Sequence, residues 1–292
     1  MLACFEFSMR CVRFGVFPGP GGEQLHGLVF DLLREVDAGW AGELHAFHIK
    51  PFSIDWLRCL ADGDASTAGE ASNLSGEVRD GNQVRRIGLG TDTLVEGRDY
   101  CFHVFSLSYP MYRALQEITR RWSGRAVQIG MARFDGTTAC ENTRLTTDYA
   151  RLMKLAADAI ERWNRRIAFS FVTPTSFRRR GEQVLFPLPE LVLGSLLTRW
   201  NALAPEPWPR DLVREADLQS SMFVTRYRLR TEAVRFAEFM LLGFVGDVSY
   251  TVRPGVPAEL LWALATLSRY SFYAGIGYRT TMGMGRARGG PQ

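Results

Sequence analysis

The sequence predicts an α+β protein made of two consecutive βαββαβ units. A chain of 292 residues is long enough for two domains, and its 46% hydrophobic composition is typical of a protein with a packed core. Strand-like and helix-like segments also follow one another in the same order twice. No tight sequence repeat accompanies that order, so the order of elements alone indicates duplication. We expect an N-terminal domain at residues 1–140 and a C-terminal domain at residues 141–292.

The first unit opens with a strand at residues 5–11, where apolar and polar side chains alternate. Apolar residues at helical spacing then run from Leu25 to Trp40, and Gly39 and Gly42 are expected to end this helix. The remaining elements expected in this unit are an extended segment at 47–57, a long polar loop at 61–93 that feeds a hairpin, a strand at 100–107, a helix at 109–122 and a strand at 126–134.

The second unit repeats this order after a connecting helix at residues 148–163. Its first strand, at 166–175, alternates in the same way as the first strand of the chain. The elements expected after it are a helix at 187–203, strands at 221–230 and 243–252 with a turn or bulge between them, a helix at 256–272 and a short strand near 285–288. Both units therefore read as βαββαβ.

The basic residues are almost all arginines. Of 35 Lys and Arg residues, only Lys50 and Lys154 are lysines, while the formal net charge is +4. A GC-rich genome explains such a bias as readily as function does. Arginine also forms bidentate hydrogen bonds with phosphates and stacks on bases, so clustered arginines favour a nucleic-acid partner.

Two arginine clusters have the geometry of phosphate contacts. In "FVTRYRLR", alternation places Arg226, Arg228 and Arg230 on one strand face. In "SFRRRG", Arg178 and Arg179 lie in a segment that we read as an exposed loop. The first cluster also fits an ordinary solvated strand face. On the strand interpretation, the residues expected on the face opposite the three arginines are Phe223, Thr225, Tyr227 and Leu229.

Several other classes of function are disfavoured. The N-terminal segment is interrupted by Glu6 and Arg10, and no apolar run approaches the roughly 18 to 20 residues that cross a bilayer, so we expect a cytoplasmic protein without a membrane partner. No C-x-x-C pair suggests zinc, and no carboxylate cluster suits two-metal nuclease chemistry. We therefore expect neither a cofactor nor a metal ion.

The C-terminal stretch "YAGIGYRTTMGMGRARGG" contains two Gly-apolar-Gly units, at 275–277 and 283–285. A dinucleotide or P-loop cradle needs strand, glycines and helix in that order, whereas here the helix comes first. The glycines can cap a helix and turn the chain, which explains one glycine better than two pairs. We expect Ile276 and Met284 to plug the loop into the core while the glycines bring backbone close to a neighbour.

The pattern GIG-x5-GMG resembles the glycine-rich loop of the RAMP superfamily, CRISPR-associated proteins built on ferredoxin-like folds. More specifically, the chain resembles the CRISPR repeat-processing endoribonuclease of that superfamily. Further stretches with this resemblance are "DYARLMKLAADAI" running into "RIAFSFVTPTSFR", "VLGSLLTRWN" and "GFVGDVSY", and they cover most of residues 140 to 288. The N-terminal half resembles the family in element order and in "LHGLVF" followed by "LHAFHIK".

The resemblance implies two tandem ferredoxin-like domains that bind CRISPR repeat RNA in a cleft and cut it once without metal. In the cleavage reaction that the resemblance implies, the ribose 2′-hydroxyl attacks the adjacent phosphate, leaving a 2′,3′-cyclic phosphate and a 5′-hydroxyl. The resemblance also allows other CRISPR effector subunits as partners. The residues that this account assigns to RNA binding are Gly275, Gly277, Arg279, Gly283, Gly285, Arg286, Arg178, Arg179, Arg226 and Arg228.

Such a reaction needs a proton acceptor, a proton donor and positive charge at the phosphate. The chain has four histidines. His45 matches the family's catalytic histidine, Lys50 lies near its charge-stabilising lysine, and His48 is the second candidate. His26, on the first helix, is a weaker candidate. His103, inside an apolar strand, reads as structural.

Two alternatives stay open at this point. A non-catalytic RAMP subunit would bind CRISPR RNA as a scaffold, but it would not need the "LHAFHIK" cluster. A generic tandem RRM-type protein is disfavoured because no RNP1-type aromatic strand is present.

Overall fold

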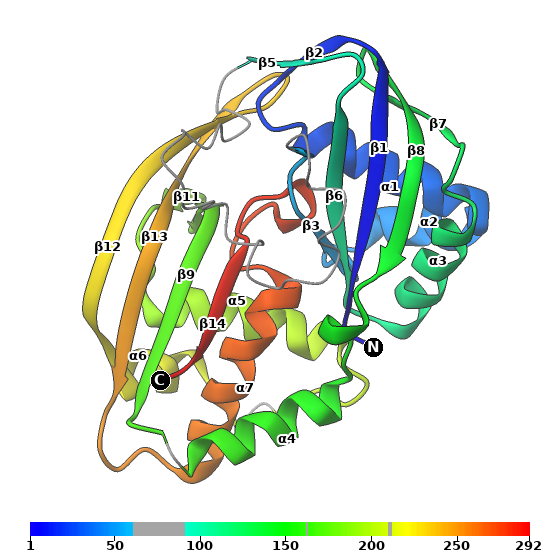
Figure 1. The fold of residues 1–292 in the computed structure, drawn as a ribbon. Helices are drawn as coiled ribbons and strands as arrows, with labels where there is room; N and C mark the ends of the chain where they lie inside the picture. The colour runs from blue at the N-terminus through cyan, green and yellow to red at the C-terminus, as the bar shows by residue number, and fades with distance from the viewer. Residues whose placement is uncertain (61–90, 162, 210–211) are drawn as a thin grey trace.

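The structure is a computed structural model that describes residues 1–60, 91–161, 163–209 and 212–292. The described chain forms two large antiparallel sheets with helices packed on them, and the segment after the last helix lies between the sheets (Figure 1). Most of the predicted polar loop, at residues 61–90, lies outside the described residues.

The first sheet has the order β3-β6-β1-β8-β7, with β4 also paired to β6. Helices α1, α2 and α3 cover the face that carries Phe5, Phe7 and Met9. Its strands are β1 (Ala3–Arg13), β3 (Phe52–Ile54), β4 (Arg58–Cys59), β6 (Asp99–Ser106), β7 (Ala126–Ile129) and β8 (Ala132–Glu141). Its helices are α1 (Gly22–Val36), α2 (Ala38–Ala46) and α3 (Tyr109–Arg120). A separate two-stranded ribbon pairs β2 (Gly15–Pro18) with β5 (Thr91–Leu94).

The second sheet has the order β12-β13-β9-β14. Its strands are β9 (Arg166–Thr175), β12 (Met222–Arg235), β13 (Met240–Val252) and β14 (Ala287–Pro291), and its helices are α4 (Tyr149–Ile160), α5 (Pro189–Leu203), α6 (Glu215–Ser221) and α7 (Ala258–Ala274). A small hairpin joins β10 (Phe177–Arg179) to β11 (Glu182–Val184), and short 3-10 turns occur at η2 (Thr143–Leu145) and η3 (Thr280–Met282).

Both sheets place the first strand of their unit at the centre, between the third and fourth strands. This is the arrangement of a ferredoxin-like βαββαβ unit. The predicted fold class, two tandem ferredoxin-like units, is therefore confirmed. The domain division at residue 140 stays a prediction.

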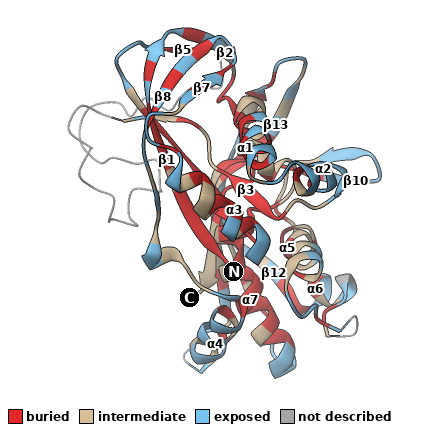
Figure 2. Ribbon diagram, turned by 90° about the vertical axis from the view of Figure 1, so that its right-hand side faces the viewer, coloured by how far each residue is buried: buried red, intermediate tan, exposed pale blue. Residues whose placement is uncertain are grey.

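Alternating apolar side chains explain why each central strand sits where it does. On β9, Ile167, Phe169 and Phe171 all point into the cluster formed with α5 and α7. Figure 2 shows that β1 and β3 are likewise buried along most of their length. Burying large side chains on one face of each sheet supplies the main driving force for these two layers.

Two predicted boundaries are wrong. The first helix ends at Val36, because Asp37 interrupts it and caps a new helix by accepting a hydrogen bond from the Trp40 amide at 2.9 Å. Gly42 therefore lies inside α2. The strand expected at 126–134 is a hairpin, β7 and β8, and Gly130 turns the chain at a φ of 60°.

The two halves share a buried boundary. Leu2, Phe105 and Leu107 from the first half belong to the hydrophobic cluster of the second. Ser53 on β3 donates a hydrogen bond to the carbonyl of Tyr273 on α7 at 2.5 Å. In the described part of the chain, no helix is long and apolar enough to cross a membrane.

Candidate nucleic-acid interface and active site

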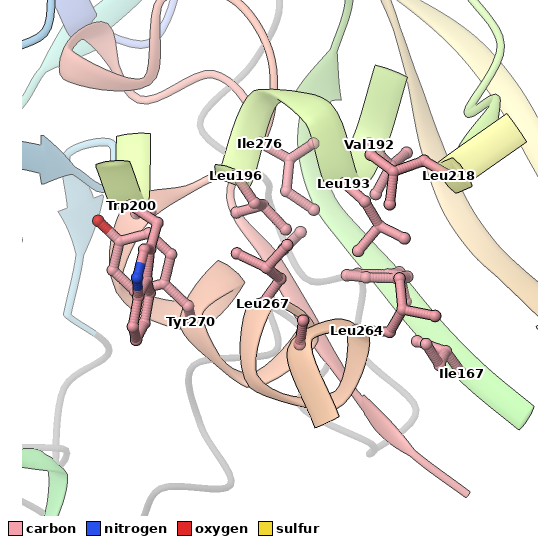
Figure 3. Packing of buried hydrophobic residues seen from close by; sticks show 14 of the residues in the cluster. Ile167, Val192, Leu193, Leu196, Trp200, Leu218, Leu264, Leu267, Tyr270 and Ile276 are labelled. Carbon is pink, nitrogen blue, oxygen red and sulfur yellow. The ribbon is translucent and has the colours of Figure 1, made fainter. Parts of the chain in front are cut away.

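The segment from Gly275 to Gly285, here called the glycine loop, leaves α7 and returns to β14. Its four glycines have φ values of 67°, 80°, 81° and 73°, all in the left-handed region that favours glycine. Ile276 and Met284 are fully buried. Ile276 joins Leu196 and Leu267 in the core of the second half (Figure 3). The expectation that both apolar residues anchor the loop is confirmed.

The neighbours that crowd the glycines are protein atoms. A Cβ at Gly277 would lie 2.4 Å from the Ser176 carbonyl oxygen, and one at Gly283 would lie 2.0 Å from Cδ1 of Trp56. Trp56 also donates from Nε1 to the Met282 carbonyl at 2.9 Å. The glycines therefore allow the loop to pack tightly between β9 and the segment after β3.

A row of stacked cations and rings lies beside the glycine loop. The guanidinium of Arg279 lies 4.5 Å from the ring centroid of Phe239 and 5.0 Å from that of Tyr278. Arg178 is exposed on the β10–β11 hairpin, and its guanidinium lies 4.7 Å from the ring centroid of the same tyrosine, Tyr278. Cation–π contacts hold these arginines in place while keeping their charge. Arg178 and Arg279 thus form a positive patch with the loop.

Arg179 lies on the same hairpin and is also exposed. Its guanidinium is 3.8 Å from the carboxylate of Glu190, which is buried at the start of α5. The segment that we read as a loop is thus an arginine-bearing hairpin next to the glycine loop.

The prediction that Arg286 contacts RNA does not fit the structure. Arg286 is only 6% exposed, and its guanidinium donates to Ser53 Oγ at 3.2 Å and to the Phe272 carbonyl at 2.6 Å. It lies 3.6 Å from the ring centroid of Phe105. Burial lowers the pKa of Arg286 to about 10, so it stays charged at neutral pH. Its contacts join the end of the glycine loop to the first sheet.

Two histidines flank the ring of Phe30 on α1. His26 lies 5.0 Å from Phe30, and His45, on α2, lies 5.3 Å from it, both measured between ring centroids. His45 is exposed and His26 is half-buried. His45 reaches this ring because it lies on α2, the helix whose N-terminus Asp37 caps.

The glycine loop fixes the orientation of His26. Nδ1 of His26 lies 3.1 Å from the Thr281 carbonyl oxygen, and since a carbonyl only accepts, Nδ1 carries the proton. Nε2 is then an acceptor when the ring is neutral. Burial lowers the pKa of His26, and the positive charges of Lys50 and Arg279 act in the same direction. His26 is thus a neutral base at pH 7, in contact with the loop.

Lys50 closes the end of α2. Its ammonium group donates to the carbonyl of His45 at 2.9 Å and to the carbonyl of Phe47. The partial negative charge at a helix C-terminus attracts it there, and one N–H remains for a ligand. Burial lowers the pKa of Lys50. His48 is exposed beyond the helix and makes no hydrogen bond or ring contact with the described residues.

The open face of the second sheet carries the predicted arginine stripe. Arg226 pairs with Ser249 and Arg228 with Asp247, which places both guanidiniums on the face opposite the core. They line a hollow of about 610 Å³ together with Arg288 and Ser170. Thr225 is bulged out of the ladder, so Phe223 pairs with Thr251 and shares the arginines' face. The expectation that Phe223 lies opposite the arginines is wrong for that reason.

His103 has a structural position. Its Nδ1 accepts from the Arg58 guanidinium at 2.7 Å, and its Nε2 donates to Glu6 at 3.2 Å. Burial lowers the pKa of His103. Both ring nitrogens are occupied, so this histidine belongs to a network on the first sheet. Among the described residues, no group of three or more His, Cys, Asp or Glu side chains could hold a metal ion.

The structure brings His26, His45, Lys50 and Arg279 to one place, whereas Arg226 and Arg228 lie on the open sheet. The sequence analysis placed His26 behind His45 and His48 as a candidate, and it did not single out Trp56. The hydrogen bond from His26 joins residues 255 positions apart, so no local pattern could reveal it.

Comparison with known proteins finds relatives in both sequence and structure. The family described as CRISPR-associated endoribonuclease Cas6 matches residues 169–287. A Cas6 of Mycobacterium tuberculosis is 26% identical over 269 residues, covering 91% of this chain and 71% of that protein. A Cas6 of Streptococcus thermophilus is 28% identical over 150 residues, or 49% of this chain and 60% of that protein.

Solved structures show the same fold over the whole chain. A Cas6 product complex is 25% identical, with a TM-score of 0.67 over 99% of this chain and 98% of that one. A second Cas6 product complex is 22% identical, with a TM-score of 0.71 over 99% and 100% of the two chains. The family match covers the second βαββαβ unit and the glycine loop, and the relatives extend it to the first. The chain therefore resembles the CRISPR-associated endoribonucleases described as Cas6, in sequence over its second half and in fold over both halves.

Proposed function

We propose that this protein is an endoribonuclease that cuts CRISPR precursor RNA within the repeat, without a metal ion, to give guide RNAs. The contact that carries the proposal is the hydrogen bond from His26 Nδ1 to Thr281, because it ties a histidine pair to the glycine loop. Support for the RNA substrate comes from relatives, which include a Cas6 product complex and a Cas6 substrate mimic complex.

In the proposed reaction, a base removes the proton of one ribose 2′-hydroxyl. The 2′-oxygen bonds to the adjacent phosphorus, the bond to the 5′-oxygen breaks, and an acid protonates that oxygen. The products are a 2′,3′-cyclic phosphate and a 5′-hydroxyl, so protons and electrons balance without a metal. We assign acid or base to His45, which is exposed beside Phe30.

His26 supplies the complementary role, because its neutral ring leaves Nε2 able to accept a proton. Lys50 would stabilise the negative charge that builds on the phosphorane with its remaining N–H, and Arg279 adds positive charge nearby. His48 stays the alternative to His45.

RNA binding is proposed for the glycine loop, for Arg178 and Arg179 on the hairpin and for Arg226 and Arg228 on the open sheet. Phosphate contacts of this kind position the RNA without reading its sequence. Duplex RNA offers side chains little in its deep groove, so shape and unpaired ends would provide specificity. We keep other CRISPR effector subunits as further proposed partners.

The test is cleavage of end-labelled repeat RNA in EDTA, beside the same RNA with one 2′-deoxyribose at the cut site. We expect one cut in the normal RNA, a 2′,3′-cyclic phosphate at its end, and no cut in the deoxy RNA. Cutting that requires added Mg²⁺, or that survives the deoxy substitution, would contradict the mechanism. Tight binding without any cut would favour the alternative function, a scaffold subunit that only binds CRISPR RNA.

A further inference from the structure

Arg199 on α5 reaches the glycine loop from the side of the second core. Its guanidinium donates to the Ala274 carbonyl at 3.2 Å, to the Gly277 carbonyl at 2.7 Å and to the hydroxyl of Thr280. Burial lowers the pKa of Arg199 to about 10, which leaves it charged at neutral pH. In the described ranges it forms no ion pair with a carboxylate, and its hydrogen-bond acceptors are the Ala274 and Gly277 carbonyls and the Thr280 hydroxyl.

These three acceptors run from the last residue of α7, Ala274, into the first half of the glycine loop. One turn earlier on α5, Ser195 Oγ accepts from the Gly277 amide at 3.2 Å, so α5 holds Gly277 through both of its backbone groups. A planar guanidinium can reach three acceptors in fixed directions. A lysine ammonium on a flexible stem keeps the charge but not this geometry.

The contact with Thr280 leads directly to the proposed active site. Thr280 is 2% exposed and is the first residue of the 3-10 turn η3. Arg279, which precedes the turn, has a left-handed backbone conformation with a φ of 56°. The next residue is Thr281, whose carbonyl accepts from His26 Nδ1. The direction of that carbonyl depends on how the turn is held. Arg199 donates to Thr280 and Trp56 donates to the Met282 carbonyl, so both residues that flank Thr281 are hydrogen-bonded to side chains outside the loop.

We propose that Arg199 is a positioning residue for RNA cleavage: it orients the Thr281 carbonyl and thereby keeps His26 protonated at Nδ1 with Nε2 free. This inference rests on the proposed function of His26 for its catalytic consequence. Its structural part, the tautomer of His26, stands independently. The charged or titratable groups that face His26 are Lys50, His45 and Arg279.

The experiment compares Arg199→Lys and Thr280→Val with wild type. Thr280→Val keeps the side-chain shape and removes the hydroxyl, so it stays informative if Arg199→Lys fails to fold. Arg151→Lys, on the exposed side of α4, is the matched control. Misplacing a reacting group by about 1 Å costs about 100-fold in rate. We expect single-turnover cutting to fall about 10- to 100-fold in both test variants.

Two further readouts separate positioning from general damage. Binding of the 2′-deoxy repeat RNA should change by less than about threefold, because RNA contacts remain. The pH at which cutting reaches half its maximum should shift in both test variants, because His26 loses its fixed environment. Loss of folded protein alone would lower the fraction of RNA that is cut and leave the half-maximal pH unchanged. That result would overturn the proposal.

The tautomer can also be measured without any cutting. With only four histidines in the chain, 15N-labelled histidine gives four resolvable pairs of ring-nitrogen signals. We expect His26 protonated at Nδ1 in wild type and a mixture of tautomers in the variants. If the protein proves not to cut RNA, this result still supports the positioning role of Arg199. Unchanged His26 signals in Arg199→Lys and Thr280→Val would contradict it.

Discussion

Replacing Gly283 by alanine should weaken the docking of the glycine loop on the first half of the protein. Gly283 has a φ of 81°, and a Cβ there would lie 2.0 Å from Cδ1 and 2.2 Å from Nε1 of Trp56. The left-handed conformation costs alanine about 1 to 2 kcal/mol. Moving the indole adds about 1 to 3 kcal/mol of overpacking, including its hydrogen bond to Met282. We therefore expect unfolding to become easier by about 2 to 5 kcal/mol.

The assay is urea unfolding of wild type, Gly283→Ala and a control, Gly255→Ala. Gly255 has a φ of 80°, but nothing lies within 4 Å of its Cβ position, so only the backbone cost applies. The difference between the two variants isolates the clash with Trp56. In a double-mutant cycle, Trp56→Ala should recover part of the loss in Gly283→Ala. Equal stability of Gly283→Ala and Gly255→Ala would refute the packing argument.

Two other predictions concern RNA binding and acid stability. Alanine at both Arg226 and Arg228 should reduce the slope of log K against log salt by about 1.4 to 1.8, since each phosphate contact contributes about 0.7 to 0.9, whereas Arg151→Ala should leave the slope unchanged. Burial lowers the pKa of His26 and His103 below 6.5, so the unfolded chain binds more protons, and the free energy of unfolding should fall as pH drops below 6.5. Urea titrations at pH 7 and 5.5 measure this, and equal values would contradict the assignment of both rings as buried and neutral.

The sequence predicted the fold well because its signals are local. Alternation at residues 5–11 and 166–175 marked the central strand of each sheet, and the later helices appeared close to their predicted bounds. The first helix was drawn too long because its apolar spacing continues past Val36 to Trp40. Asp37 ended it through a capping hydrogen bond, which apolar spacing does not record.

The site was less predictable because its contacts are distant in the chain. The glycine units pointed to the loop, and Ile276 and Met284 are buried as expected. Arg286 looked like its neighbours in sequence, but it is buried against the first half of the protein, where its guanidinium donates to Ser53 and lies over the ring of Phe105. Nothing in a single sequence separates an arginine that faces a solvated loop from one that faces Ser53.

The most direct test of the account is the single-turnover rate of repeat RNA cleavage in EDTA by wild type, His45→Ala, His26→Ala and His48→Ala. A positioned proton donor or acceptor contributes about 100- to 10,000-fold. We expect losses of that size for His45→Ala and His26→Ala, with His48→Ala close to wild type and RNA binding retained in all three. Cutting at the wild-type rate by both His45→Ala and His26→Ala would contradict a histidine pair at the glycine loop as the catalytic centre.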